Sequence, residues 1–169
     1  YEDRFRCCNI RSKTWYEYRN GRWFNIDSGT TLRQALSQTI SNIYHTAVKK
    51  TLDKLGNIEE MEKDEEREKA LQKEAFTMSQ MALKLKKTTW KQNIMRECSE
   101  VFYCENFQDK LDTHSHLLCF NNGVLDMKEN VFRDGRPDDY LSMCTNTDYC
   151  EFDPQNPEHI RISEEITYF

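Results

Sequence analysis

Glycine is scarce in this 169-residue chain, which contains only five glycines and three prolines. The glycine-rich signatures of nucleotide-binding loops, Gly-x-x-x-x-Gly-Lys-Ser/Thr and Gly-x-Gly-x-x-Gly, do not occur in it. The motifs Gly-x-Ser-x-Gly and His-Glu-x-x-His of hydrolases and zinc proteases are absent as well. Because the familiar catalytic motifs are missing, we do not expect this chain to be an enzyme by itself.

Long apolar stretches are also missing, since no run approaches the ~20 residues of a membrane-spanning helix. No signal peptide is visible either, so we expect no membrane partner. The seven cysteines are odd in number and irregularly spaced, at positions 7, 8, 98, 104, 119, 144 and 150. This pattern favours reduced thiols in a reducing, intracellular compartment over a disulfide framework.

Charge is unevenly distributed in a chain whose length and composition suit one soluble domain, residues 1–169. The net charge of -5 is not that of a simple nucleic-acid coat. Residues 1–55 carry ten Lys and Arg against five Asp and Glu, and residues 84–98 carry five against one. Residues 56–83 and 99–169 have net charges of -4 and -10. A surface that contacts phosphate can be built from the two basic segments.

Two aromatic-rich runs within residues 14–26 flank Asn20-Gly21. They predict a β-hairpin, because Asn-Gly tolerates the positive φ of a tight turn. From Leu32 onward, apolar residues recur at spacings of three and four, which predicts one long helix that Gly56-Asn57 ends. Its predicted buried stripe consists of Leu32, Ala35, Leu36, Thr39, Ile40, Ile43, Tyr44, Ala47, Val48, Leu52 and Leu55.

Residues 59–69 contain almost nothing to bury. Their Glu59/Lys63 and Glu65/Lys69 pairs favour a solvated first half of a second helix, with a mobile loop as the alternative. The predicted core face of this helix is Ala70, Leu71, Ala75, Met78, Ala82 and Leu83. A third helix is predicted to start at Thr88 or Thr89 and to bury Trp90, Ile94, Cys98, Val101 and Phe102. Short connections between these helices imply an antiparallel bundle.

The last third of the chain predicts a small sheet. Residues 117–120 and 124–127 form two strands around a turn, residues 131–133 a third, and residues 141–149 alternate loosely enough for a fourth. Ser163-Glu164-Glu165 predicts a helix N-cap, so we expect the chain to stop in the first turn of a helix and to be a piece of a longer protein. The predicted fold is α+β, with an N-terminal aromatic β-hairpin, an antiparallel three-helix middle and a small C-terminal β-sheet.

Five cations surround Trp90 at the predicted connection between the second and third helices, namely Lys84, Lys86, Lys87, Lys91 and Arg96. Cations beside an exposed aromatic ring suit single-stranded nucleic acid, because they contact the phosphates while a base stacks on the ring. The alternative is a solvated helix end, in which Lys86 and Lys87 complement the helix dipole and Trp90 is core.

The predicted hairpin also has two possible uses, as a nucleic-acid contact or as part of the core. Arg19 and Arg22 are candidate nucleic-acid contacts, and Arg11, Lys13, Trp15 and Trp23 are their neighbours. Packing of both tryptophans into the core is the simpler use of these large apolar rings.

Two groups of residues suggest metal ligands. The adjacent carboxylates of Asp138 and Asp139 can hold a divalent ion, but Gly135 and Pro137 beside them favour a turn whose Asp residues cap backbone amides. His114, His116 and Cys119, completed by Cys98 or Cys104, have the side chains of a zinc site. No Cys-x-x-Cys pair accompanies them, and buried free cysteine is ordinary in an apolar strand. We therefore predict no metal ligand.

Residues 111–149 resemble the domain that precedes the superfamily 3 helicase module in poxvirus-type and other large-DNA-virus primase-helicases. Phage and plasmid primase-helicases carry a similar segment. The matching positions are Leu118, Phe120, Asn122, Gly123, Val124, Asp126, Phe132, Arg133, Pro137, Asp139, Tyr140, Thr145 and Tyr149. The early pattern Trp15-Tyr16-x-Tyr18-x-x-Gly21-x-Trp23 is similar to the entry of that domain.

The resemblance implies an accessory domain that joins primase to helicase in a viral DNA replication protein. It implies a ring, normally a hexamer, that passes single-stranded DNA to the motor, and partners in the adjacent primase and helicase modules. ATP and Mg²⁺ would bind in the helicase module and no cofactor in this chain, and the site of action would be the host cytoplasm or nucleus. No catalytic residue carries over. The alternatives are a stand-alone metal-binding or nuclease domain and a purely structural interaction module.

Overall fold

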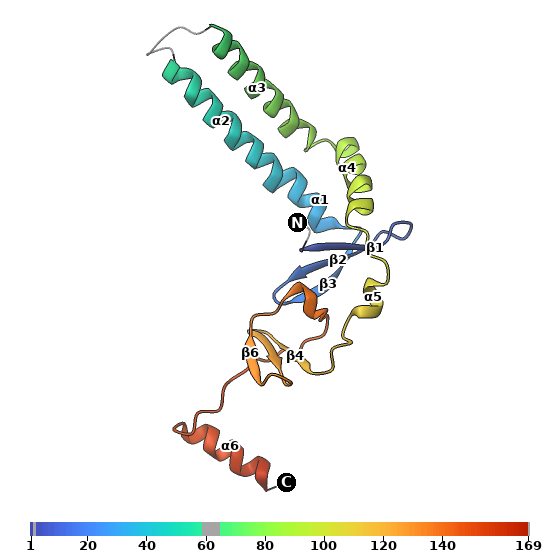
Figure 1. Cartoon of the computed structure of the whole chain (residues 1–169), viewed down its shortest axis with the longest axis vertical. Helices are drawn as coiled ribbons and strands as arrows, with labels where there is room; N and C mark the ends of the chain where they lie inside the picture. The colour runs from blue at the N-terminus through green and yellow to red at the C-terminus, as the bar shows by residue number, and fades with distance from the viewer. Residues whose placement is uncertain (2, 59–64, 169) are drawn as a thin grey trace. The chain divides into compact units, whose positions relative to one another are not determined.

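The computed structural model describes residues 1, 3–58 and 65–168, in which strands, helices and a second set of strands follow one another (Figure 1). The predicted α+β class is confirmed. The residues divide into two compact units. The first contains Tyr1–Glu17 and Phe24–Asp109, and the second contains Tyr18–Trp23 and Lys110–Phe169.

An antiparallel sheet is formed by the first three strands, β1 (Phe5–Asn9), β2 (Thr14–Arg19) and β3 (Arg22–Asp27), in the order β1-β2-β3. The predicted hairpin is β2–β3, and its turn residues Asn20 and Gly21 have φ values of 48° and 75°. Strand β1 was not predicted. It pairs with β2 so that Cys7 lies opposite Trp15.

The core of the first unit lies on one face of this sheet, where alternating side chains of β1 and β2 point inward. Its buried members are Phe5, Cys7, Trp15, Ile26 and Leu32. Met95, Cys98 and Phe102, from α4 (Thr88–Val101) and its C-terminal end, pack against them. The expectation that Trp15 serves the core is confirmed.

The predicted long helix is continuous but contains an irregularity. It begins as α1 (Thr30–Ala35), passes through one π-helical turn (Leu36–Ile40) and continues as α2 (Ser41–Ile58). It therefore runs through Gly56-Asn57 rather than ending there. The π turn adds one residue to the helical repeat, so the buried position after Leu36 is Ser41, five residues later.

This shift explains why part of the predicted stripe is wrong. After the π turn the stripe consists of Ser41, Tyr44, Val48, Thr51 and Leu55, whereas Ile43 and Leu52 are exposed. A regular spacing of three and four residues had placed Ile43 and Leu52 inside. A single extra residue rotates everything that follows by about 100°, the angle per residue of an α-helix.

Helix α3 (Glu65–Lys84) runs antiparallel to α2 and lies beside it (Figure 1). Its stripe of Leu71, Ala75, Met78, Ala82 and Leu85 matches the spacing of α2, as in an antiparallel coiled coil. The buried Ser41 hydroxyl donates to the Ala82 carbonyl at 3.2 Å. The predicted core residues Ala70 and Leu83 are instead exposed.

The charged segment before this stripe is confirmed only in part. Residues 65–69 begin α3 mostly exposed, and the Lys69 ammonium lies 3.5 Å from the Glu65 carboxylate. Residues 59–64, including the predicted Glu59/Lys63 pair, lie outside the described residues. Helix α4 starts at Thr88 as predicted, but Trp90 and Val101 are exposed, so their predicted burial is wrong.

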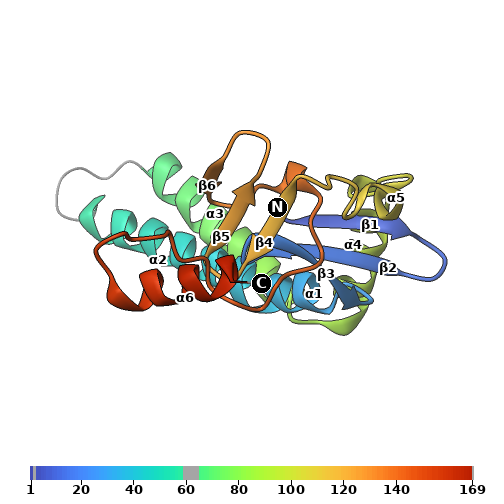
Figure 2. The ribbon, with the colours of Figure 1, turned by 90° about the horizontal axis from the view of Figure 1, so that it is seen from below.

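The sheet of the second unit has the order β4-β5-β6 and consists of Leu117–Phe120, Gly123–Asp126 and Val131–Arg133 (Figure 2). Its core contains Leu117, Cys119, Val124 and Leu141. Residues 141–149 do not form the predicted fourth strand. Scattered backbone bonds, such as Thr145 N–H to the Cys119 carbonyl, hold them, and left-handed residues Tyr140 and Asn146 interrupt a regular ladder.

The second unit also contains residues 18–23, the tip of the β2–β3 hairpin. Gly135 lies so close to Gly21 that a Cβ on Gly135 would be 2.6 Å from the Gly21 carbonyl oxygen. The buried Trp23 donates its indole N–H to the Pro137 carbonyl at 2.9 Å and its backbone N–H to the Leu141 carbonyl at 2.7 Å. Gly21 and Trp23, from the early part of the resemblance, therefore meet residues of its later part in this unit.

The last helix, α6 (Pro157–Thr167), starts earlier than predicted. Its N-cap is Asn156, whose side chain accepts from the Glu158 N–H at 3.0 Å, and Pro157 occupies the first helical position. Ser163 is therefore inside the helix and not its cap. Within the described part of the chain, no helix combines the length and apolar character that a membrane span requires. All seven cysteines are free.

Candidate nucleic-acid interface

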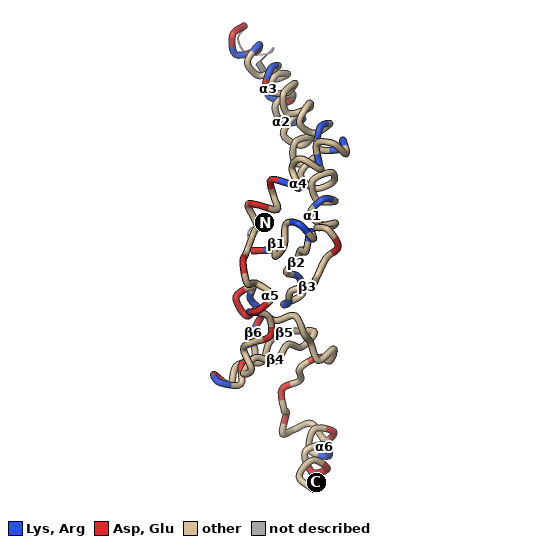
Figure 3. Tube along the Cα trace, turned by 90° about the vertical axis from the view of Figure 1, so that its right-hand side faces the viewer, with Lys and Arg blue, Asp and Glu red and all other residues tan. Residues whose placement is uncertain are grey.

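The predicted cation block lies where α3 ends and α4 begins, in the first unit (Figure 3). Leu85 is buried, and the backbone N–H groups of Lys86 and Lys87 bond back to the carbonyls of Leu83 and Lys84, which makes the connection short. Leu85 anchors the turn, and Lys86 and Lys87, the two residues that follow it, are exposed. Two of the predicted cations are thus presented on a rigid corner.

Trp90 lies in the first turn of α4 and is 42% exposed. The Lys84 ammonium lies 4.6 Å from the centroid of its ring, a cation–π contact that orients the indole. The alternative in which Trp90 is a core residue is therefore wrong. An exposed indole with an ammonium group over its ring provides both a stacking surface and positive charge.

The remaining two predicted cations lie further along α4. Lys91 is half-buried, whereas Arg96 is exposed and lines a recess of about 480 Å³ that Trp90 does not line. Lys13, from the β1–β2 loop, and Arg33, from α1, line the same recess. The structure therefore divides the predicted block between the Lys84–Trp90 corner and this recess.

The recess brings together cations that the sequence keeps far apart. The sequence places Lys13 beside the aromatic hairpin and gives no signal that marks Arg33. Nothing near Arg33 in the sequence marks it, because its neighbours Lys13 and Arg96 come from positions 20 and 63 residues away. Only the packing of α1 and α4 on the first sheet assembles the group.

Arg19 and Arg22, the other predicted contacts, belong to the second unit. Arg19 is exposed and Arg22 is half-buried. The positive charge of Arg22 lowers the pKa of the Cys119 thiol, but burial raises this pKa by more. These two arginines therefore belong to a different compact unit from the connection between α3 and α4.

The candidate carboxylate pair is a turn, as predicted. Asp139 lies in a short 3₁₀ helix (Pro137–Asp139) and is buried, whereas Asp138 is exposed. The Arg133 guanidinium binds both Asp139 carboxylate oxygens, at 2.7 and 2.8 Å, and the Arg136 backbone N–H donates at 2.7 Å. These bonds occupy the Asp139 carboxylate, so it caps a turn.

The candidate zinc ligands are not gathered into a cluster. The rings of His114 and His116 are 5.8 Å apart, and the His114 Nδ1 lies 3.2 Å from the Asp139 carbonyl. Burial raises the pKa of the Cys119 thiol to about 11, which is the state of an apolar core cysteine. Residues 1, 3–58 and 65–168 contain no group of three or more metal-binding side chains close enough to share an ion.

The residues that carry the resemblance hold the second unit together. The Asn122 side chain bonds to both the N–H and the carbonyl of Tyr149, at 2.8 and 2.9 Å. Gly123 has no room for a side chain, since a Cβ there would lie 2.6 Å from the Phe132 ring. Asp126 accepts from the N–H groups of Lys128 and Glu129 and so fixes the β5–β6 turn. The motif is therefore a folding motif.

Comparison with known proteins places these features in context. A family model described as D5 N terminal like matches residues 1–167. A protein of Acanthamoeba polyphaga mimivirus named "Putative helicase" is 35% identical over 153 residues, which cover 90% of this chain and 15% of that protein. A protein of Frog virus 3 (isolate Goorha) with the same description is 28% identical over 180 residues, covering 91% of this chain and 18% of that protein. The chain thus spans less than a fifth of the length of these relatives.

Proposed function

The chain belongs to the D5 N terminal like family, and from this membership we propose that it is an accessory domain of a viral DNA replication helicase that binds single-stranded DNA. The observation that carries the proposal is the exposed Trp90 with Lys84 over its ring, at the end of a connection whose Lys86 and Lys87 are exposed. One base stacks on the indole and the lysines contact the neighbouring phosphates. Stacking is indifferent to base identity, so the binding is independent of sequence.

The other activities belong to the longer protein. We propose that ATP and Mg²⁺ bind in a helicase module outside this chain, and that a primase module is the other neighbour. The relatives named as helicases are more than five times as long as the stretch they share with this chain, which leaves ample room for such modules. The site of action would be the place of viral DNA replication, in the host cytoplasm or nucleus.

Binding of a fluorescein-labelled oligothymidine, measured by anisotropy at low and high salt, tests the DNA proposal. We expect Trp90→Ala to weaken binding by about 5- to 160-fold, because base–aromatic stacking contributes about 1–3 kcal/mol per base. Lys86→Gln combined with Lys87→Gln removes two phosphate contacts, so the slope of log K against log salt falls by about 1.4.

The matched control is Lys49→Gln combined with Lys54→Gln, which neutralises two exposed lysines of α2 in the same unit. It removes the same net charge and is expected to leave the anisotropy nearly unchanged. Binding without salt sensitivity, or an equal loss in the control pair, overturns the proposed interface.

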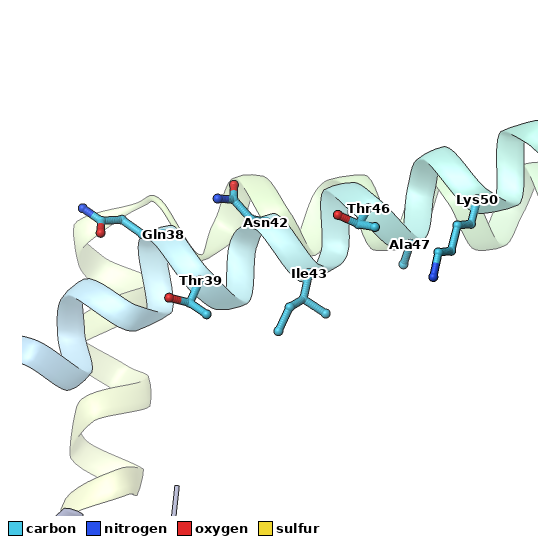
Figure 4. Close-up of a pocket in the computed structure, with 7 residues that line it drawn as sticks. All are labelled: Gln38, Thr39, Asn42, Ile43, Thr46, Ala47 and Lys50. Carbon is cyan, nitrogen blue, oxygen red and sulfur yellow. The ribbon is translucent and has the colours of Figure 1, made fainter. Parts of the chain in front are cut away.

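We propose a second role, self-association toward a ring, because the α2–α3 pair carries large exposed apolar side chains. Phe76 and Leu83 are seven residues apart, on one face of α3, and Phe76 is 66% exposed. A groove of about 650 Å³ is lined by Gln38 and Thr39 of the π turn and by Asn42, Ile43, Thr46, Ala47 and Lys50 of α2 (Figure 4). Ile43, at its centre, is 60% exposed.

Light scattering across a concentration series tests this role. We expect the mass of the natural chain to rise with concentration, and Phe76→Gln combined with Ile43→Gln to restore the monomer mass. Glu74→Ala, an exposed residue about 160° around α3 from Phe76, is the control and leaves association unchanged. A natural chain that stays monomeric up to its highest soluble concentration contradicts this role.

A further inference from the structure

The recess beside α4 differs from the Trp90 corner in its lining. Its charged side chains are Lys13, Arg33 and Arg96, and its polar ones are Ser28, Gln92, Asn93 and Ser99. The apolar lining consists of Ile10, Trp15 and Met95. No Asp or Glu lines it. Three different elements, the β1–β2 loop, α1 and α4, each supply one cation.

These three cations have no acidic partner. No carboxylate of the described residues lies within ion-pair distance of Lys13, Arg33 or Arg96, and their side-chain nitrogens donate no hydrogen bond within that part of the chain. The carboxamides of Gln92 and Asn93 also make no hydrogen bond to a described residue. Like charges that converge without compensation repel one another, and an anion between them removes the repulsion.

The lining is fixed by the core. Trp15 is buried and Met95 packs against the same core cluster, so the floor of the recess cannot collapse easily. Lys13 adopts a left-handed backbone conformation with φ of 53°, which a lysine adopts at a cost in energy of about 1 kcal/mol or more. The loop that holds it is fixed by the Asn9 side chain, which accepts from the Ser12 N–H at 2.9 Å. The loop therefore presents Lys13 to the recess.

We propose that this recess is a phosphate-binding site, in which Arg33 and Arg96 bind the phosphate oxygens, Lys13 adds charge and the Gln92 or Asn93 amide completes the hydrogen bonds. Arginine provides paired donors that match phosphate geometry. The phosphate belongs either to a DNA strand or to a free nucleotide or phosphate ion. Arg96 follows Trp90 by six residues of α4, which is about 9 Å along the axis and about 120° around it, so a strand that contacts both must pass around the helix. Where the phosphate belongs to a DNA strand, the proposal of this site rests on the proposed function.

The test uses Trp15, whose ring lines the recess, as the reporter. In a Trp90→Phe protein the remaining tryptophans are Trp15 and Trp23, and Trp23 is buried in the second unit. Potassium phosphate is titrated against potassium chloride at equal ionic strength, and tryptophan emission is recorded. We expect a saturable change with phosphate alone, and an affinity about 10- to 100-fold lower in Arg96→Gln, because a charge-assisted hydrogen bond is lost. No saturable change, or an unchanged affinity in Arg96→Gln, overturns the site.

Lys13→Asn separates binding from stability. Asparagine tolerates the left-handed conformation, so the thermal midpoint is expected to stay the same or rise while phosphate affinity falls. Lys73→Gln, an exposed lysine of α3, is the control and changes neither quantity. If Lys13→Asn lowers the midpoint and leaves phosphate affinity intact, Lys13 is structural and the site is wrong.

Oligonucleotides distinguish the sources of the phosphate. Oligothymidine that displaces inorganic phosphate from the recess identifies a strand as the ligand, and nucleoside monophosphate that displaces it where oligothymidine fails identifies a free nucleotide. The two proposals fail separately. An absent phosphate response with intact, Trp90-dependent DNA binding overturns the recess alone, and a normal phosphate response without DNA binding overturns the proposed function alone.

Discussion

Replacing Asp139 with asparagine is expected to lower the free energy of unfolding of the second unit by about 2–4 kcal/mol at neutral pH. Asp139 is 6% exposed and forms two hydrogen bonds with the Arg133 guanidinium. Removing one partner of a buried ion pair leaves the other charge uncompensated, at a cost of about 3–5 kcal/mol when both are fully buried. The Arg133 side chain is 21% exposed, so water offsets part of the loss.

The same carboxylate gives stability a pH dependence. Burial tends to raise the pKa of Asp139, but hydrogen bonds from the Arg133 guanidinium and the Arg136 N–H outweigh it and leave the pKa below the usual value. Because the folded pKa is lower than the unfolded one, which is about 3.9, the stabilisation is complete above that value. It is lost as the pH falls through the folded pKa. The Asp139→Asn protein should show a flatter dependence in this acid range.

Urea unfolding monitored by tryptophan fluorescence measures both effects. Asp138→Asn is the matched control, because Asp138 is the adjacent carboxylate but is exposed. We expect it to change the free energy of unfolding by no more than about 0.5 kcal/mol. Equal losses in the two variants would show that the Arg133 pair does not hold the turn.

Replacing Gly135 with alanine is expected to destabilise the second unit by about 1–3 kcal/mol, the usual cost of overpacking. The added Cβ would lie 2.6 Å from the Gly21 carbonyl oxygen and 2.8 Å from the Gly21 Cα. Both are backbone atoms, which no change of rotamer can move away. The hairpin tip and the loop before the 3₁₀ helix must then separate, which strains the Trp23 bond to the Pro137 carbonyl.

Gly56→Ala is the control for this substitution. Gly56 lies in α2, and a Cβ there would meet nothing within 4 Å. Alanine in place of a helical glycine stabilises by about 0.5–1 kcal/mol, so the thermal midpoint should rise for Gly56→Ala and fall for Gly135→Ala. A midpoint that rises in both proteins would contradict the close approach of the two glycines.

Some turns and helix starts that depend on a few neighbouring residues were predicted correctly from the sequence. Asn20-Gly21 gave the correct hairpin because its left-handed preference belongs to the dipeptide itself. The start of α4 at Thr88 and the turn at Pro137–Asp139 were correct for similar reasons. Strand β1 was missed, because Phe5 and Cys7 are recognisable as core only once β1 pairs with β2. The buried face of α2 was misjudged, because the π turn before Ser41 shifts its register.

The sequence predicted most of the residues of the candidate interface but not which of them lie together. Sequence proximity grouped Arg96 with Lys84 and Trp90, while the structure places Arg96 with Lys13 and Arg33. The exposure of Trp90 could not be inferred from spacing, because it depends on which face of α4 meets the first sheet. An aromatic residue next to lysines reads equally well as core or as a stacking platform until that face is known.

The amino-acid sequence alone determined the α+β class, the turns and the resemblance to a family, because turn preferences and helical periodicity act over a few neighbouring residues. Tertiary structure alone decided that Gly135 meets Gly21, that Trp90 is exposed and that Lys13, Arg33 and Arg96 share a recess. Burial and charge compensation depend on residues brought together from distant parts of the chain, and no local pattern encodes which ones will meet.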